Sequence, residues 1–575
     1  GRLDAIELNG DILTNGDLAD MDVVRDVPTN GNSSDDTGAG GEVSGNYCTW
    51  NPNVKNRPGG TTSFDFKNGN LEVHNVLNAY GIALGTIPMS SGKWYWEITV
   101  DGTPNNTYDY IGIIASDNEV NYPTHPNMPD AYWYRAGGTK LHESTSTSYG
   151  ATYGDGDVIG IALDLDSATT TLTFYKNGTS QGTAFSSLPA GKSWLSAVGD
   201  YSNALTTTSW KANWGQRAFA YSAPSGYKAL CTTNLPTPTI ADGSEHFDIK
   251  LWTGNGSTDR DITGLSFSPD LTWIKIRNGV YGHFWFDTVR GATKDINSEA
   301  NYAESTVANS LQSFESDGFN LGNSVYVNQN GETYVAWNWD AGSSTVSNTD
   351  GSITSSVRAN QTAGFSIVTY SGTDTGSSQT IGHGLNAAPK LWMFKNRSAA
   401  GDWIVYTTAI DGGSDYAKLN ATDAFAAGVS PWSTAPTSSV VTVGTNNVDT
   451  CNAGDDYVLY AFTPVAGYSA IGHFTSNNTT DNVFLYTGFA PRFIIWKITN
   501  TAGGWSIYDT ARDPVNPNNT YLRANAADAE ATATPGVMDF LSNGFKVRNT
   551  LGGTNSLIYM AFASNPFQAN GGLAR

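Results

Sequence analysis

The chain has 575 residues, of which only 15% are charged and 12% aromatic, and its formal net charge is −22. This acidic balance excludes nucleic acid and anionic membrane surfaces as expected partners, because binding to phosphate groups needs clustered Lys and Arg. No apolar run approaches the roughly 18 residues of a membrane-spanning helix, so we expect no membrane insertion. The 62 glycines and the many aromatic residues favour short strands and tight turns, and we expect a nearly all-β chain of about four domains.

The first 60 residues show no long periodic segment. Residues 1–24 carry a short apolar spacing that Gly10 and Gly16 interrupt, which indicates an arm that attaches the chain to a neighbouring subunit. Residues 25–60 are dense in Gly, Asn, Asp and Pro, a composition typical of a linker. No secretory signal is visible in this region.

The clearest strand pattern lies in residues 154–185. Four apolar residues alternate along one stretch with the period of two that a half-buried strand requires: Ile159, Ile161, Leu163 and Leu165. The chain then returns through Leu172 and Phe174 and turns again at Asn177-Gly178, a strong hairpin dipeptide. The pattern therefore predicts three strands in a meander.

This meander resembles the centre of a SPRY (B30.2-like) domain, and the flanking segments agree with that family in the same order. The matching segments are SGKWYWEITV (91–100), YIGIIASD (110–117), WLSAVGD (194–200) and ANWGQRAFAYSAPSGYKAL (212–230). The resemblance implies a bent sandwich of two antiparallel sheets at residues 61–235. It also implies that this domain binds partners through its loops and has no catalytic residues of its own.

Two pieces of the preceding segment carry a second resemblance. DVPTN (26–30) and GNYCTWNP (45–52) resemble a lead-in that precedes SPRY-like domains in tail-associated proteins of marine bacteriophages. The position of these pieces directly before the SPRY-like region supports the resemblance, which implies a virion protein.

Exposed loop aromatics are the candidate ligand-binding residues. The segment 118–130 holds three prolines and no periodicity, so Tyr122 and His125 are expected on an exposed loop, with packing of the loop base as the alternative. Trp432 lies in a second such loop and could stack on a sugar ring. The consecutive aromatics 132–134 fall where the SPRY family places a strand, and we assign them mainly to the core.

After residue 235 three segments repeat the same pattern of Pro, hydrophobic strand and Lys. They are PDLTWIK (269–275), PKLWMFK (389–395) and PRFIIWK (491–497), and similar second and third motifs follow each of them. The lysines are 120 and 102 residues apart, a spacing that fits complete small domains rather than solenoid repeats. We expect three tandem β-sandwich modules, at 236–345, 346–466 and 467–575. Each resembles a repeated domain of unknown role in phage virion proteins.

The second motif of the first and third modules places an Arg three residues after an Asp. Asp287 and Asp509 could be catalytic carboxylates, with Arg290 and Arg512 beside them. However, the second module has Thr407 at the matching position, and each Asp has an Arg ready to pair with it. We therefore favour a structural Asp–Arg pair and expect no catalytic residues and no enzyme activity.

Metal and cofactor sites are not indicated by the sequence. Asp155, Asp157, Asp164 and Asp166 could suggest calcium, but they flank a strand without EF-hand spacing. The seven histidines are dispersed, and Cys48, Cys231 and Cys451 are too far apart for a zinc site or a disulfide framework. Phosphate-binding glycine loops and nucleophile motifs are missing as well. We expect no metal and no cofactor.

These observations favour a virion structural protein of a bacteriophage, most directly a tail fibre or appendage subunit that adsorbs to the host. The arm at residues 1–24 would attach to other virion proteins, and the loops would bind a surface glycan or outer-membrane protein. A homotrimer would multiply weak contacts by valency. The alternatives are a capsid decoration or head-fibre protein and a polysaccharide-degrading tailspike.

Overall fold

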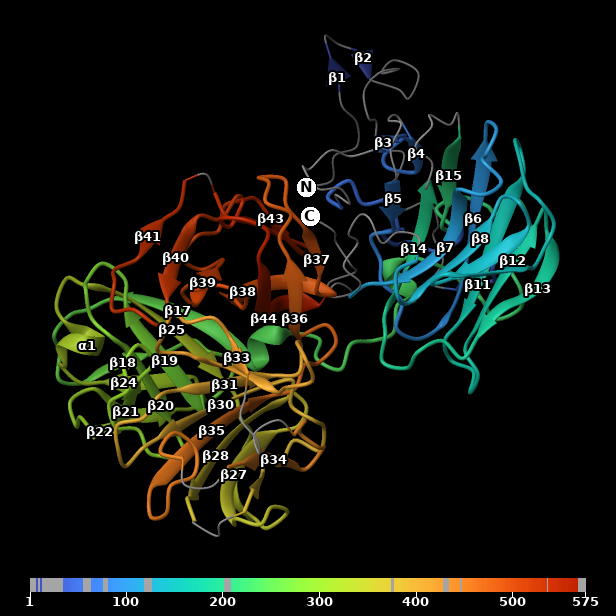
Figure 1. The fold of residues 1–575 in the computed structure, drawn as a ribbon. Coiled ribbons are helices and arrows are strands. Elements are labelled where there is room, and N and C mark those ends of the chain that lie inside the picture. The colour runs from blue at the N-terminus through green and yellow to red at the C-terminus, as the bar shows by residue number, and fades with distance from the viewer. Residues whose placement is uncertain are drawn as a thin grey trace. The chain divides into compact units, whose positions relative to one another are not determined.

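A computed structural model describes residues 7–8, 11–12, 35–54, 64–75, 81–117, 127–200, 208–373, 377–427, 434–444, 447–534 and 536–566. The chain divides into two compact units. The N-terminal unit comprises residues 1–237 and 567–575, and the C-terminal unit comprises residues 238–566. Both are built almost wholly from antiparallel strands (Figure 1), so the predicted all-β, multi-sandwich fold class is confirmed.

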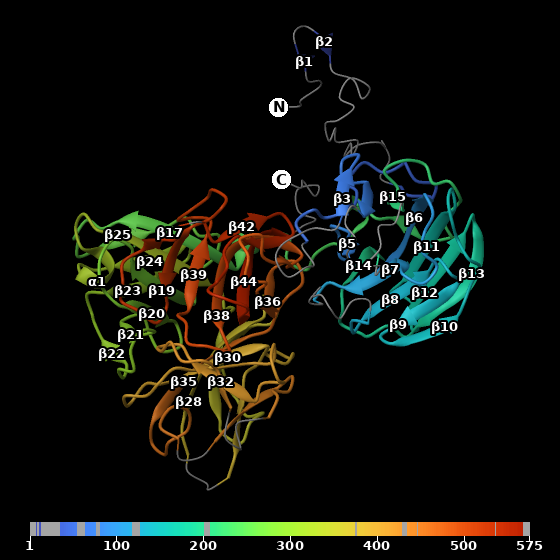
Figure 2. The same ribbon diagram turned by 45° about the horizontal axis from the view of Figure 1, so that its top comes forward.

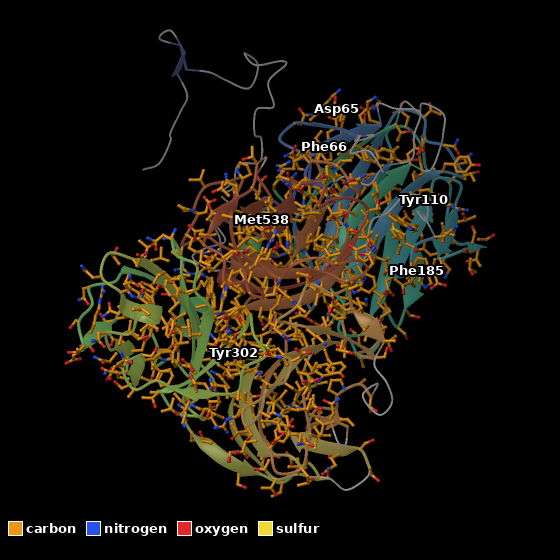
Figure 3. All side chains as sticks on the ribbon, turned by 60° about the vertical axis from the view of Figure 1, so that its left-hand side comes forward. Asp65, Phe66, Tyr110, Phe185, Tyr302 and Met538 are labelled. Atoms are coloured by element: carbon orange, nitrogen blue, oxygen red, sulfur yellow. The ribbon has the colours of Figure 1, made fainter. Side chains whose placement is uncertain are left out.

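The N-terminal unit is a sandwich of two sheets. One sheet has the order β10 (Thr145–Ser148), β9 (Thr139–His142), β8 (Ala131–Arg135), β7 (Asp109–Ala115), β14 (Trp194–Asp200) and β5 (Gly81–Leu84). The other has the order β13 (Thr179–Ser186), β12 (Thr171–Lys176), β11 (Val158–Asp164), β6 (Lys93–Asp101), β15 (Ser209–Asn213), β4 (Glu72–Asn75) and β3 (Phe64–Lys67), and β16 (Lys228–Ala229) adds to β6 in parallel. Figure 3 marks one aromatic residue from each sheet, Tyr110 on β7 and Phe185 on β13.

The predicted meander at 154–185 is confirmed as β11, β12 and β13. Ile161 pairs with Phe174 and Leu163 with Leu172 across β11 and β12, and all four side chains are buried in the core between the sheets. Asn177 and Gly178 form the tight turn with φ of 47° and 76°. Positive φ at both positions is what a two-residue hairpin turn of the favoured twist requires. The predicted core residues Tyr132, Trp133 and Tyr134 are also buried.

The segment predicted as a linker, 25–60, differs from that prediction where it is described. Within residues 35–54, Trp50 is fully buried, and its ring lies edge-on to that of Trp214 with 4.8 Å between the ring centroids. The backbone of Tyr47 forms an isolated antiparallel β-bridge with that of Cys231. Gly40 has φ of 74°, and an added Cβ would lie 2.6 Å from the carbonyl oxygen of Arg217. The glycines therefore permit close approach to the sandwich, whereas their number had indicated flexibility. Of the predicted arm at 1–24, the described part is a two-strand pair, β1 (Glu7–Leu8) and β2 (Asp11–Ile12).

The C-terminal unit contains three large sheets, each covered on one face by a small sheet. The first large sheet runs β17 (Phe247–Thr253), β25 (Thr333–Trp339), β19 (Leu271–Ile276), β20 (His283–Asp287), β21 (Lys294–Asn297), β22 (Ser305–Thr306). The second runs β26 (Thr345–Asn348), β27 (Ser355–Asn360), β28 (Phe365–Ser371), β35 (Asp456–Phe462), β30 (Leu391–Asn396), β31 (Ile404–Thr407), β32 (Asp415–Lys418), β33 (Ala426–Ala427). The third runs β36 (Ser469–Thr475), β44 (Ser556–Pro566), β38 (Phe489–Ile498), β39 (Ser506–Asp509), β40 (Thr520–Arg523), β41 (Ala531–Thr532).

The small sheets complete three sandwiches, called here the first, second and third sandwich in chain order. They consist of β18 (Arg260–Ile262), β24 (Gly318–Leu321) and β23 (Leu311–Glu315) in the first, β29 (Gln379–Gly382) and β34 (Val440–Val443) in the second, and β37 (Phe484–Tyr486), β43 (Gly544–Val547) and β42 (Met538–Leu541) in the third. The described helices are short: η1 (Thr232–Asn234), η2 (Gly243–Glu245) and α1 (Val325–Asn328). Apart from the added hairpin β26–β27, the three large sheets follow the same strand order.

Each large sheet is buried on both faces. In β19, Leu271 and Trp273 point into a core that all three sandwiches share, while Ile274 and Ile276 point into the core of the first sandwich alone. In β38, Phe493 and Ile495 enter the shared core, and Ile494 enters the core of the third sandwich. A strand covered on both sides reads as a continuous hydrophobic run, as these strands do in the sequence. Figure 2 shows the green, gold and red parts of the chain meeting around this centre.

We predict that Gly178→Ala destabilises the N-terminal sandwich by about 1–2 kcal/mol, because an L-residue with a Cβ is disfavoured at positive φ. The added Cβ would also lie 2.5 Å from Cδ1 of Tyr221. Urea unfolding followed by tryptophan fluorescence measures the change. Gly154→Ala is the matched control, since no atom lies within 4 Å of its added Cβ. Equal stability of the two variants would contradict the assigned turn.

Candidate functional site

The three residues predicted to bind a ligand lie outside the described residues. Tyr122 and His125 belong to the undescribed segment 118–126, and Trp432 belongs to 428–433. Their role as exposed loop aromatics therefore stays a prediction.

The four aspartates considered for calcium are engaged by different partners at the ends of β11. Asp155 accepts a hydrogen bond from the backbone N–H of Gly102 at 2.7 Å, and Asp166 accepts one from Gly92 at 2.6 Å. Asp157 pairs with Lys176 at 3.0 Å, and Asp164 pairs with Lys93 at 2.9 Å. These carboxylates stabilise turns and strand ends. Over the described ranges, no group of three or more His, Cys, Asp or Glu side chains is placed to hold a metal ion.

A buried pair of carboxylates lies at one end of the N-terminal sandwich. Asp109 on β7 faces Asp200 on β14 directly across the strand pair, and both residues are fully buried. Oδ2 of Asp109 accepts hydrogen bonds from Asn105 N at 2.8 Å and from Thr208 Oγ1 at 3.0 Å. Burial, and secondarily the charge of Asp200, raises the pKa of Asp109 to about 7. At neutral pH this carboxyl can therefore hold or release a proton.

In the C-terminal unit, each of the three lysines of the repeated motif lies one residue before the end of its strand, at the border of the shared core. Lys275, Lys395 and Lys497 are each 0% exposed, which is unusual for lysine. Burial lowers the pKa of each to about 8. A buried ammonium group needs hydrogen-bond acceptors. The location of these acceptors therefore shows which parts of the structure each lysine joins.

Each lysine donates hydrogen bonds to carbonyl oxygens of its own sandwich and of a neighbouring one. Lys395 Nζ bonds to Gly401 O at 2.7 Å and, in the first sandwich, to Asn301 O at 3.2 Å. Lys497 Nζ bonds to Gly503 O at 2.5 Å and, in the second sandwich, to Thr422 O at 3.0 Å. Lys275 makes the third contact of this kind.

Lys275 Nζ bonds to Ile276 O at 2.7 Å and, in the third sandwich, to Ala527 O at 3.3 Å. The second sandwich thus contacts the first, the third contacts the second, and the first contacts the third. The three sandwiches form a closed ring with three seams, which we name by the sandwiches they join.

The first–second seam contains the predicted Asp–Arg pair. Asp287 and Arg290 form an ion pair whose side chains are 0% exposed, and Asp287 Oδ2 also accepts a hydrogen bond from Tyr460 of the second sandwich at 2.7 Å. Arg290 reaches Glu304 at 3.2 Å, and Glu304 accepts two hydrogen bonds from Arg397 of the second sandwich at 2.9 and 3.1 Å. A chain of charges therefore crosses this seam.

The third–first seam repeats this arrangement with different residues. Asp509 pairs with Arg512 at 2.5 Å and accepts a hydrogen bond from Trp337 Nε1 of the first sandwich at 3.1 Å. Arg512 contacts Glu530 at 3.1 Å, and Glu530 is bound by Arg277 of the first sandwich at 2.8 and 3.0 Å.

The second–third seam carries neutral residues at every matching position. In place of the Asp, the Arg and the Glu of the other two seams it has Thr407, Ile410 and Phe425. In place of the second Arg and the aromatic donor it has Thr499 and Met560. The backbone contact is nevertheless kept: Phe425 N bonds to Thr499 O at 2.9 Å, as Glu304 N bonds to Arg397 O at 2.9 Å and Glu530 N to Arg277 O at 2.6 Å.

Asp287 and Asp509 are both fully buried and held by arginine. The predicted structural pairing is present, but the sequence reasoning missed that each pair extends through Glu304 or Glu530 to an arginine of the neighbouring sandwich. A usable signal existed. Where Asp becomes Thr407 in the second module, the matching Arg has also become Ile410, and Glu has become Phe425.

Comparison with protein families gives two matches. Residues 242–566, more than half of the chain, match the model described as a domain of unknown function, DUF7483. Residues 93–200 match the SPRY domain. The predicted SPRY resemblance is confirmed over that range.

Individual relatives each match a part of this chain. The Set1 complex component ash2 of Schizosaccharomyces pombe is 30% identical over 95 residues, which is 16% of this chain and 14% of the relative's length. The SPRY domain of human HERC1 is 22% identical and covers 26% of this chain and 92% of that structure, with a TM-score of 0.23. The PSpry domain of TRIM65 is 15% identical and covers 29% and 89%, with a TM-score of 0.23.

We predict that Asp109→Asn makes the protein less sensitive to rising pH. In the wild type the folded-state pKa of Asp109, about 7, lies above the unfolded value of 3.8, so its contribution to stability falls as pH rises from about 4 to about 7. The neutral amide has no such loss, and relative to the wild type the variant gains stability on the order of 2–4 kcal/mol between these pH values. Urea unfolding at pH 4 and 8 measures the difference. Asp65→Asn, at the surface (Figure 3), serves as control, and a pH-independent difference for Asp109→Asn would refute the prediction.

For the buried lysines we predict the opposite pH dependence: their contribution to the stability of the folded protein increases as pH rises. The folded-state pKa of Lys395, about 8, lies below the unfolded value of 10.5, so the unfolded chain binds more protons between these values and wild-type stability rises with pH. Lys395→Met removes this gain, which amounts to about 2 kcal/mol between pH 8 and 9.5. Thermal unfolding at both pH values measures it, with the half-exposed Lys67→Met as control. Parallel pH profiles for the wild type and Lys395→Met would show that Lys395 is not buried as described.

Proposed function

We propose that this chain, which belongs to the family defined by the domain of unknown function DUF7483 and contains a SPRY domain, is a non-catalytic binding and structural protein of a bacteriophage virion. The resemblance of residues 26–30 and 45–52 to a lead-in of phage tail-associated proteins supports the virion part of this proposal. Its most direct role is that of a tail fibre or appendage subunit that recognises the host surface. The N-terminal arm attaches it to other virion proteins. Loops of the SPRY domain bind a surface glycan or an outer-membrane protein, and three chains act together as a homotrimer.

One observation supports a binding role over chemistry in the C-terminal unit. The two carboxylates with the best claim to catalysis, Asp287 and Asp509, are fully buried and each is bound by an arginine and by an aromatic donor of another sandwich. A general acid or base must reach the proton that it transfers, and these groups are enclosed. Their arrangement supports a rigid scaffold instead.

We also propose that the three sandwiches are copies of one module, related to a repeated domain of phage virion proteins. The shared strand order of the large sheets supports this, as do three lysines that bond to matching carbonyl groups across three seams. Duplication of such a module supplies length and several surfaces, which suits a structural role.

A capsid decoration or head-fibre protein is the second candidate. The observation that favours it is the closed ring: within one chain, three sandwiches already complete the shared core, and this core needs no further subunit. A protein mounted singly on a shell fits this arrangement.

We predict that the full-length protein binds bacterial surface glycans on an array and leaves them intact. Mass spectrometry of capsule or lipopolysaccharide after incubation detects any released oligosaccharide. Binding without cleavage supports the proposal. Release of oligosaccharides that is lost in Asp509→Asn, with folding verified by circular dichroism, would instead establish the polysaccharide-degrading tailspike alternative. Absence of binding to glycans and to outer-membrane protein extracts would refute a receptor-binding role.

A further inference from the structure

Among the described residues, every ion pair that joins two sandwiches has one member in the first sandwich. Over the described residues of the C-terminal unit they are Arg397–Glu304 and Arg358–Asp270 at the first–second seam, and Arg277–Glu530 and Arg492–Asp248 at the third–first seam. We propose that the first sandwich is held in the ring by this ionic latch, and that it separates first when Glu304 and Glu530 lose their charge, while the second and third sandwiches stay joined.

At the first–second seam, Glu304 is the central group of the latch. Arg290 and Arg397 contact it from opposite sides of the seam, at 3.2 and 2.9 Å, and Lys294 lies at 4.0 Å. Asp295, a buried like charge, is the nearby acid. Burial alone would raise the pKa of Glu304, but the two arginines outweigh it and lower this pKa below its ordinary value.

At the third–first seam, Glu530 takes the same role. Arg277 binds it from the first sandwich and Arg512 from the third, and the charge of Lys275 also acts between the two sandwiches. The guanidinium of Arg512 also lies over the ring of Trp337, 5.6 Å from its centroid. Both ends of the latch thus join a glutamate to two arginines, one from each sandwich.

Two further pairs extend the latch to other strands. Arg358 of the second sandwich contacts Asp270 at 2.6 Å, and Arg492 of the third contacts Asp248 at 2.6 Å, with Lys250 at 3.4 Å from Asp248. Burial raises the pKa of Asp270 to about 6, against the opposing effect of Arg358.

The second–third seam has no ion pair between described residues. Its hydrogen bonds include the backbone bonds from Phe425 N to Thr499 O and from Gly503 N to Thr422 O. Lys497 Nζ also bonds to Thr422 O, and Trp505 Nε1 bonds to Lys418 O at 2.9 Å. Asp423 acts on Lys497 only through its charge. Protonation of carboxylates removes none of these hydrogen bonds.

Loss of charge on Glu304 or Glu530 would leave the arginine across the seam, Arg397 or Arg277, without its ion partner. Arg290 or Arg512 would then be balanced by its aspartate alone. The side chains of Arg290 and Arg512 are 0% exposed, so water cannot replace the lost carboxylate unless the seam opens. Removal of one partner of a buried ion pair is strongly destabilising for this reason. At the first–second seam, protonation of Glu304 by acid would have this effect, and the two arginines hold its pKa below its ordinary value.

Neutral substitution tests the latch without acid. In the full-length protein at pH 7, Glu304→Gln/Glu530→Gln keeps the shape of both side chains and removes both charges. Hydrogen exchange read by mass spectrometry should be at least tenfold faster in β19, β20 and β25 of the first sandwich. The amide of Phe425, at the second–third seam, should exchange as in the wild type. Glu315→Gln, an exposed glutamate of the first sandwich, is the matched control and should change nothing.

Three outcomes would overturn the proposal. They are equal acceleration in all three sandwiches, acceleration confined to the second–third seam, and no acceleration anywhere. Should the double variant not fold, the single variants Glu304→Gln and Glu530→Gln decide. Each should accelerate exchange on its own side of the first sandwich, while Phe425 stays protected. Acceleration at Phe425 in either single variant would contradict the latch.

Discussion

The burial of a lysine ammonium group at each seam of the ring is the constraint on which the C-terminal unit depends. Lys275, Lys395 and Lys497 extend from strands that line the shared core, and each finds an acceptor in the neighbouring sandwich. A charged group in such a place is tolerated only when its hydrogen bonds are made, and these bonds exist only when the neighbour is docked. The lysines therefore couple the position of each sandwich to the next, and the shared core supplies the apolar burial that holds the ring closed.

The two kinds of seam follow from the same physical rule. At the charged seams each buried aspartate or glutamate is paired with an arginine. Removal of one member would leave the other buried with a missing partner, so the charged positions are present together or absent together. The first–second and third–first seams have the full set, with Tyr460 or Trp337 donating to the aspartate. At the second–third seam Thr407 replaces the aspartate, and the set is neutral throughout.

The sequence predicted the elements that depend on local pattern. Alternation in β11 and the Asn177-Gly178 turn led to the correct meander, because side-chain period and turn conformation are local properties. The Pro-to-Lys motifs pointed to equivalent strands. What could not be read was ring closure, because Lys275 meets Ala527 across 252 residues of chain and no periodicity encodes that contact. The linker prediction at 25–60 was wrong for residues 35–54. It was based on the many glycines of this segment, and it overlooked residues such as Trp50 that are buried against the sandwich.

The candidate ligand residues Tyr122, His125 and Trp432 lie outside the described residues, so the binding site rests on loop composition alone. The buried acids are better defined. Asp287 and Asp509 form the predicted ion pairs with an Arg three residues away, because that spacing offers each aspartate a partner within its own turn. The extension of each pair into a neighbouring sandwich needed the structure.

Hydrogen exchange at the amides of Glu304, Phe425 and Glu530 in the intact protein tests ring closure most directly. Each of these amides donates to a carbonyl group of a different sandwich: Arg397, Thr499 and Arg277 respectively. A closed ring predicts that all three are protected at neutral pH, with exchange slowed by a factor of at least about 1,000 relative to an unstructured peptide, as for amides that open only with large structural units. Exchange of any one of them at the rate of an unstructured peptide would contradict the closed ring.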